Sequence, residues 1–196
     1  MKEKTQHKLT IGLTGGIGCG KSAVLAAWQQ LGAYTLDCDE LVREITVRPA
    51  VQKQIAAAFG VTEKRALARK VFASCAARKQ LEQLLHPLVH REMAKRLRAV
   101  SASVRVVEVP LLFEAGWEKD FDITVAVAAP EKQVQARVKQ RGLTQTELAA
   151  RQWAQWPQAQ KMACADIAIL NQGSITDLKN KISILHRALC KIYHIK

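Results

Sequence analysis

The stretch that decides the fold reads Leu13-Thr14-Gly15-Gly16-Ile17-Gly18-Cys19-Gly20-Lys21-Ser22. It contains the complete pattern G-x-x-x-x-G-K-[ST], in which glycines let successive backbone N–H groups surround a phosphate. A short apolar, β-branched run at 9–13 precedes the loop, and helix-forming residues follow it as far as Gly32. Strand, glycine-rich loop and helix is the context in which this pattern binds phosphate. The sequence therefore predicts a site for a nucleoside triphosphate.

The expected nucleotide contacts lie in this loop and in the first turn of the helix that follows. The helix N-terminus adds the positive end of its dipole. Lys21 is expected to reach the β- and γ-phosphate oxygens, and the Ser22 hydroxyl to ligate Mg²⁺. Because the nearby backbone N–H groups and Lys21 would stabilise a thiolate, we expect Cys19 to have a lowered pKa and an oxidisable thiol. The predicted nucleotide-binding residues are Gly16, Ile17, Gly18, Cys19, Gly20, Lys21, Ser22 and Ala23.

Composition places the chain among ordinary globular proteins. Its 196 residues are 48% hydrophobic and 24% charged, which fits one domain with a substantial core. The five cysteines are scattered and form no C-x-x-C pair, so we expect reduced thiols and neither a disulfide framework nor a zinc site. No apolar run reaches membrane-spanning length, and the polar start has no signal-peptide core. We expect a cytoplasmic protein that does not bind membranes.

The net charge of +13 is the unusual global property. It is compatible with a nucleic-acid partner, with attraction of polyanionic small molecules, or with a general basic bias. Nucleic-acid binders usually gather basic residues in a patch with aromatic residues nearby. Here the basic residues run from Lys2 to Lys196 and only 5% of residues are aromatic. No nucleic-acid partner is expected, although charge alone does not decide between these explanations.

Strand-length apolar runs predict the architecture. They occur at 9–13, 34–36, 104–109, 123–128 and 167–170. Helix-like stretches separate most of them, which is typical of a parallel sheet with crossover helices. We therefore predict an α/β fold, the three-layer P-loop NTPase architecture with about five parallel strands.

Two helical segments interrupt this pattern and predict a division of the single domain. The nucleotide-binding core is expected to comprise 8–38, 103–130 and 163–196. Residues 39–102 show helical periodicity over a length too great for one crossover, so we predict an inserted helical substrate subdomain, in which Pro87 opens a helix.

Residues 131–162 are expected to form a lid. Its first helix carries Arg137 and Arg141, and Thr144 to Glu147 has the spacing of a capping box that starts a second helix.

A last helix of the nucleotide-binding core is expected from near Ser174 toward Tyr193.

Two carboxylates, Asp37 and Asp39, follow the second predicted strand. Strand ends line the ligand crevice of a parallel sheet, and a spacing of two on an extended strand end places both on one face. One carboxylate can orient Mg²⁺ through water while the other accepts the proton of an attacking hydroxyl. The alternative is that Asp39 caps the next helix, and which aspartate is the base stays open.

Several other residues allow two interpretations. Arg137 is either a lid arginine that neutralises the migrating phosphoryl group or part of a solvated face. Glu108 is either a metal partner at a strand end or a salt bridge at the rim. His86 on general grounds is more often structural, and Trp153 and Trp156 are expected to pack rather than to stack on a ligand.

Taken together, these residues resemble the dephospho-CoA kinase family over nearly the whole chain. The phosphate loop is generic, but the H-P element at 85–88 and the P-L-L-F-E element at 110–114 are specific. The other matching segments are D-x-D-x-x-x-R at 37–43, Q-R-G at 140–142, R-x-x-x-Q at 151–155, A-D-I at 165–167 and N-x-G at 171–173. The departures are Cys19, where that family usually has Ser or Ala, Lys64, which lies near an expected Arg, and Glu108, where Asp is common. The lid positions around Trp153–Ala159 are also atypical of the family.

The resemblance implies that ATP, with Mg²⁺, phosphorylates the ribose 3′-hydroxyl of dephospho-CoA. It implies that Asp39 is the base, that Lys21 and Arg141 clamp phosphates, and that segment 39–102 holds the pantetheine arm. The implied substrate contacts are Asp39, His86, Pro110, Leu111, Arg151 and Gln155; Asn171 is an implied nucleotide contact, and Ser22 and Asp37 are implied metal ligands. We expect a monomer or a small homo-oligomer.

Two alternative functions remain. One is another P-loop small-molecule kinase, similar to shikimate or nucleoside-monophosphate kinases, which the H-P and P-L-L-F-E elements disfavour. The other is an ATP-regulated RNA-binding protein, which the net charge of +13 suggests. A GTPase is disfavoured because 180–183 lacks the final aspartate of a guanine-reading N-K-x-D motif.

Overall fold

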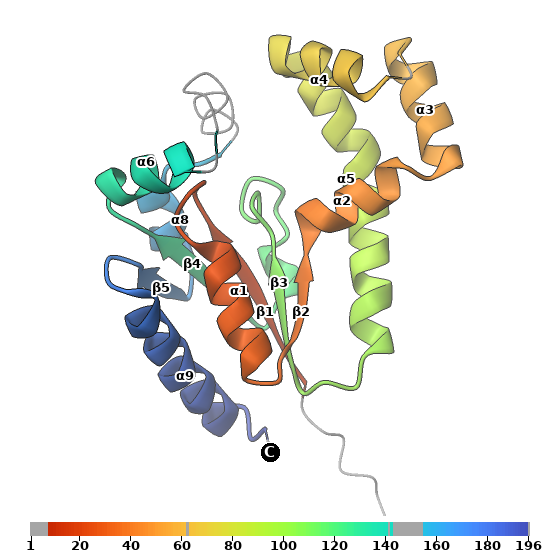
Figure 1. Cartoon of the computed structure of the whole chain (residues 1–196). Helices are drawn as coiled ribbons and strands as arrows, with labels where there is room; N and C mark the ends of the chain where they lie inside the picture. The colour runs from red at the N-terminus through yellow and green to blue at the C-terminus, as the bar shows by residue number, and fades with distance from the viewer. Residues whose placement is uncertain (1–7, 62, 141, 143–154, 196) are drawn as a thin grey trace, which may run out of the picture. The chain divides into compact units, whose positions relative to one another are not determined.

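A computed structural model describes residues 8–61, 63–140, 142 and 155–195 of the chain (Figure 1). The chain forms two compact units. The first, Met1–Asp37 with Val100–Lys196, is called here the sheet unit, and the second, Cys38–Ala99, the helical unit.

The sheet unit is built on a five-stranded parallel sheet of order β2-β3-β1-β4-β5. The central strand β1 is buried at every residue because a parallel sheet is covered on both faces, whereas the edge strands β2 and β5 are only partly buried. The strands are β1 (Leu9–Gly15), β2 (Tyr34–Asp37), β3 (Val104–Glu108), β4 (Ile123–Ala128) and β5 (Ile167–Leu170). The predicted α/β class and five-stranded parallel sheet are confirmed.

Helices cover this sheet on both faces. In Figure 1, α1 (Lys21–Gln30) and α9 (Ile175–Ile192) lie side by side on one face, and α8 (Gln158–Cys164) packs on β1, β4 and β5. Trp28 and Ile182 are completely buried where α1 and α9 join the core. The remaining described elements are α6 (Glu131–Gln140) and the short 3₁₀ helix η1 (Glu118–Asp120).

The start of α9 agrees with the sequence pattern. Ser174 is its N-cap, and its hydroxyl accepts a hydrogen bond from the N–H of Asp177 while the Asp177 carboxylate accepts from the Ser174 N–H. This reciprocal capping box satisfies two otherwise unpaired donors. The predicted capping box at Thr144 to Glu147 lies outside the described residues.

The helical unit contains α2 (Cys38–Thr46), α3 (Pro49–Phe59), α4 (Lys64–Ala73) and α5 (Cys75–Ala99). Its core includes one face of α5, where Leu85, Val89, Met93 and Leu97 are buried at a spacing of four residues. Arg96 of α5 forms an ion pair with Glu44 of α2, which adds a polar contact between these two helices.

Two local predictions in the helical unit are wrong. Pro87 does not open a helix but lies inside α5, twelve residues after its first residue. The packed face around it outweighs the missing N–H, which otherwise weakens a helix interior. Asp39 does not lie on an extended strand end, because the chain is helical from Cys38 onward; the alternating-face argument for Asp37 and Asp39 therefore fails.

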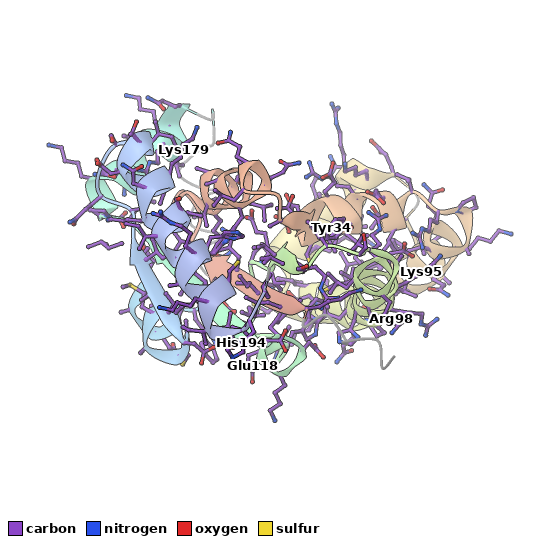
Figure 2. The ribbon with its side chains drawn as sticks, turned by 90° about the horizontal axis from the view of Figure 1, so that it is seen from below. Tyr34, Lys95, Arg98, Glu118, Lys179 and His194 are labelled. Carbon is purple, nitrogen blue, oxygen red and sulfur yellow. The ribbon has the colours of Figure 1, made fainter. Side chains whose placement is uncertain are left out.

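Basic side chains are distributed over both units. Figure 2 labels Lys95 and Arg98 on α5 of the helical unit and Lys179 on α9 of the sheet unit. Among the described helices, none has both the length and the apolar character needed to cross a bilayer.

Candidate functional site

The phosphate loop joins β1 to α1, and its backbone depends on two glycines. Gly15 has φ 146°, and a Cβ there would lie 2.2 Å from the carbonyl oxygen of Val127. Gly20 has φ 98°, and a Cβ there would lie 2.3 Å from Nδ2 of Asn171. The left-handed backbone and the close neighbouring atoms both exclude a side chain at these two positions. The conformation of the loop therefore requires glycine there.

The N-terminus of α1 is suited to an anion. Its N-cap, Gly20, supplies no side-chain hydrogen bond, and its first turn contains no acidic residue. Lys21 is 9% exposed and donates from Nζ to the carbonyl of Gly16 at 3.2 Å, whereas Ser22 in the same turn is exposed. A helix dipole, a lysine held along the loop and an accessible hydroxyl are the components that bind a phosphate group.

Two distant residues support the outer side of the loop. Nη1 of Arg137 donates to the carbonyls of Gly18 at 3.2 Å and Cys19 at 3.4 Å. Nδ2 of the buried Asn171 donates to the same Cys19 carbonyl at 2.8 Å. Arg137 is thus not part of a solvated face, and the side chain of Asn171 contacts the phosphate loop.

Cys19 differs from the sequence prediction. The side chain is fully buried, and its thiol donates a hydrogen bond to Oε1 of Gln158 at 3.1 Å. Burial raises the pKa of the Cys19 thiol even though Lys21 acts in the opposite direction. The prediction of a lowered pKa is therefore wrong, because it counted the nearby positive charge and not the loss of solvation.

Acidic residues lie at the carboxyl ends of two neighbouring strands. Glu108 ends β3 and Asp37 ends β2, and the two are paired in the sheet register. Oε1 of Glu108 is 3.8 Å from Nζ of Lys21, and both side chains are buried. The salt bridge is therefore internal and adjoins the phosphate loop rather than lying at an exposed rim.

The P-L-L-F-E element follows β3 and packs under the loop. The Pro110 carbonyl accepts hydrogen bonds from Oγ1 of Thr14 at 3.3 Å and from Nζ of Lys161. Oε1 of Glu114 accepts from the Trp156 N–H at 2.6 Å and pairs with Lys161. These contacts place Pro110 and the half-buried Leu111 at the carboxyl edge of the sheet.

A cavity of about 320 Å³ lies beside the phosphate loop. Gln155, a predicted substrate contact, is in its wall, and Gly16 and Ile17 of the loop form another part. The remaining lining residues are Glu131, Trp156, Pro157 and Gln158. The structure therefore brings Gln155 next to the first turn of the loop.

The helical unit contains the other described site residues. Asp39 is exposed in the first turn of α2, and the half-buried His86 lies within α5. Burial lowers the pKa of His86 below its usual value, with Glu82 acting in the opposite direction. The predicted phosphate clamp Arg141 and the predicted substrate contact Arg151 lie outside the described residues.

Sequence reasoning missed two residues of α8, Gln158 and Lys161. Gln158 accepts hydrogen bonds from the thiol of the loop residue Cys19 and from the Ala129 N–H, and Lys161 donates to the Pro110 carbonyl of the P-L-L-F-E element. Their spacing of three residues, which places them on one helix face, is the signal that could have linked them. Nothing in the local pattern indicated that Lys161 would be completely buried.

The parallel sheet, the loop between its first strand and first helix, and the buried lysine at its base define the P-loop NTPase class. A comparison with protein-family models is consistent with this class: the model described as dephospho-CoA kinase matches residues 9–177. The chain belongs to the dephospho-CoA kinase family.

Individual relatives agree. The dephospho-CoA kinase of Thiobacillus denitrificans is 36% identical over 189 residues, covering 91% of this chain and 94% of the relative. A crystal structure from Thermus thermophilus is also 36% identical, with a TM-score of 0.81, and covers 94% of this chain and 99% of that one. The shikimate kinase of Acinetobacter baumannii, at 16% identity and a TM-score of 0.53 over 93% and 95% of the two chains, shares the fold alone.

Proposed function

We propose that this chain transfers the γ-phosphoryl group of ATP to the ribose 3′-hydroxyl of dephospho-CoA, giving coenzyme A and ADP. The observation that carries the proposal is the phosphate loop, with buried Lys21 at its base, in a chain that belongs to the dephospho-CoA kinase family. In this transfer a bond forms between the hydroxyl oxygen and the γ-phosphorus. The bond from that phosphorus to the β–γ bridging oxygen breaks, and ADP departs with the electron pair.

The sheet unit supplies the nucleotide half of the site. The loop N–H groups and the α1 dipole bind the phosphates of ATP, and Lys21 neutralises charge that develops during transfer. Arg137 and Asn171 hold the Gly18 and Cys19 carbonyls, which keeps the loop in its binding conformation. Preorganised donors of this kind stabilise the transition state without rearranging during the reaction.

The residues present also fit Mg²⁺. Ser22 presents an exposed hydroxyl in the first turn of α1, and Asp37 and Glu108 end adjacent strands. Hydroxyl and carboxylate oxygens are the ligands that Mg²⁺ prefers. When bound, the ion supplies charge neutralisation for the phosphates. Ser22 and Asp37 are proposed to hold it, and Glu108 to orient Lys21 beside it.

The proposed acceptor contacts follow the family resemblance. Asp39 is proposed to accept the proton of the 3′-hydroxyl, because an exposed carboxylate can act as a general base. His86, Pro110, Leu111 and Gln155 are proposed substrate contacts. The proposed phosphate-clamping role of Arg141 and the proposed substrate contact of Arg151 rest on the family resemblance alone.

An ADP-release assay with three acceptors tests this function. Dephospho-CoA should stimulate ADP release strongly, while shikimate and AMP should leave the basal rate unchanged. Phosphorus NMR of the product should show a new 3′-phosphomonoester. Stimulation by shikimate or AMP alone would favour the alternative kinases. Binding of RNA with affinity that falls steeply with salt concentration would favour the nucleic-acid alternative.

A further inference from the structure

A buried ion pair joins the P-L-L-F-E element to α8. Lys161 is 0% exposed, and its Nζ lies 2.8 Å from Oε1 of Glu114 while donating to the Pro110 carbonyl. Burial lowers the pKa of Lys161, and Glu114 opposes this effect. A buried ion pair gains little over apolar residues of similar size, because desolvation offsets its attraction. A stabilising role alone therefore does not account for this lysine.

The pair determines where the chain enters α8. The same Glu114 oxygen that meets Lys161 accepts the Trp156 N–H at 2.6 Å. The Trp156 ring stacks on Phe113, with ring centroids 6.1 Å apart and planes inclined by 12°. One carboxylate oxygen, held by Lys161, thus fixes the backbone of Trp156, while Phe113 of the same element holds its ring.

Trp156 is part of the cavity wall beside the phosphate loop, together with Gln155 and Pro157. The cavity adjoins Gly16, whose carbonyl accepts from Nζ of Lys21. Because the loop lysine reaches the β- and γ-phosphates, this end of the loop receives the phosphoryl group that is transferred. Since the same wall contains Gln155, a proposed substrate contact, we expect it to lie beside the γ-phosphate and the incoming acceptor.

We propose that Lys161 is a positioning residue that acts through Glu114 to hold the Gln155–Pro157 wall at the acceptor side of the γ-phosphate. The proposal rests on the proposed function. Lys161 is therefore expected to affect phosphoryl transfer and acceptor placement, whereas nucleotide binding depends on the phosphate loop. Small displacements of positioning groups cost large factors in rate, because reacting atoms must be held near their attack geometry.

The test compares Lys161→Met with the double variant Lys161→Met/Glu114→Gln. The single variant leaves a buried carboxylate without its cation, whereas the double variant removes both charges and should recover the melting temperature. In both variants kcat/KM for dephospho-CoA should fall by about 10- to 100-fold. The Kd of a non-hydrolysable ATP analogue should stay within about twofold, since the phosphate loop is intact. The matched control is Lys179→Met on the exposed surface of α9 (Figure 2), which should behave as wild type.

A spectroscopic readout separates positioning from general stability. After labelling with 5-fluorotryptophan, the ¹⁹F resonance of Trp156, assigned with Trp156→Phe, should move in both Lys161 variants. The resonance of Trp28, which is buried in the sheet-unit core, should stay in place and report an intact fold.

The inference is overturned if Lys161→Met retains wild-type kcat/KM, or if the double variant regains activity together with its melting temperature. An unmoved Trp156 resonance would overturn it as well. A wild-type protein that binds ATP but does not phosphorylate dephospho-CoA would instead overturn the proposed function, because the ¹⁹F and ATP-binding measurements do not depend on the acceptor.

Discussion

Lys21 and Glu108 form a buried ion pair at the base of the phosphate loop, with Nζ 3.8 Å from Oε1 and the two side chains 10% and 8% exposed. Glu108 in turn is the register partner of Asp37 on the neighbouring strand. The loop lysine and two strand-end carboxylates therefore belong to one edge of the sheet. A bound triphosphate and its metal ion would meet a site in which a positive and a negative side chain already balance each other.

Replacing either strand-end carboxylate should weaken metal use. In Asp37→Asn and Glu108→Gln, the Mg²⁺ concentration for half-maximal ADP release should rise by about tenfold, because each change removes a negative charge near the phosphates. Titration of MgCl₂ at saturating ATP and dephospho-CoA measures this effect. Glu63→Gln, at the exposed N-cap of α4, is the control. An unchanged Mg²⁺ requirement in Asp37→Asn would remove Asp37 as a metal ligand.

Asp39→Asn should reduce kcat without weakening nucleotide binding. The amide cannot accept the hydroxyl proton, and general-base catalysis contributes about 10²- to 10⁴-fold. Single-turnover kinetics together with calorimetric titration of an ATP analogue would measure the two effects separately. Glu40→Gln alters the neighbouring residue in the same helical turn and should leave kcat close to that of wild type. Near-normal turnover of Asp39→Asn would show that another group takes the proton.

Gly20→Ala should be more harmful than Gly116→Ala, although both glycines have positive φ. At Gly116, φ is 69° and an added Cβ meets no atom within 4 Å, so the cost is backbone strain of about 1–2 kcal/mol. At Gly20 the new Cβ would displace Asn171 and break its bond to the Cys19 carbonyl, adding about 1–3 kcal/mol. Denaturant unfolding measures the difference, and ATP affinity should fall only in Gly20→Ala. Equal losses in the two variants would contradict the tight packing at Gly20.

Asp166 should make stability depend on pH in the acid range. Its Oδ2 accepts from the Thr124 N–H at 2.7 Å and the Thr124 hydroxyl at 2.6 Å, and these bonds lower the pKa of Asp166. Because the pKa of Asp166 is lower in the folded state, its carboxylate contributes fully to folding stability above the unfolded-state pKa of about 3.9. This contribution is lost as the pH falls through the folded-state pKa. The difference in melting temperature between wild type and Asp166→Ala should therefore shrink below about pH 4. A difference that stays constant down to pH 2 would show that the carboxylate charge is not involved.

Much of the architecture follows from local pattern. The run at 123–128 coincides with β4 because an inner strand of a parallel sheet is buried on both faces and reads as a continuous apolar segment. The run at 167–170 coincides with β5, although this edge strand is exposed at Ala168 and Leu170. The phosphate loop could also be predicted from the sequence, because its backbone geometry requires glycines at fixed positions. Asp37 ends the second strand, but α2 begins at Cys38, so the extended geometry predicted for Asp39 is wrong.

The side-chain contacts that hold the phosphate loop in place could not be predicted from local sequence patterns. Arg137 contacts Gly18 across 119 positions of sequence, and Asn171 contacts Cys19 across 152. The pKa of Cys19 and the burial of Lys161 likewise depend on which distant segments cover them. Residue types and spacing thus determined the strands, the loop and the family, because these depend on neighbours in sequence. Only the folded chain decided which side chains hold the loop in place, because desolvation and hydrogen bonding depend on neighbours in space.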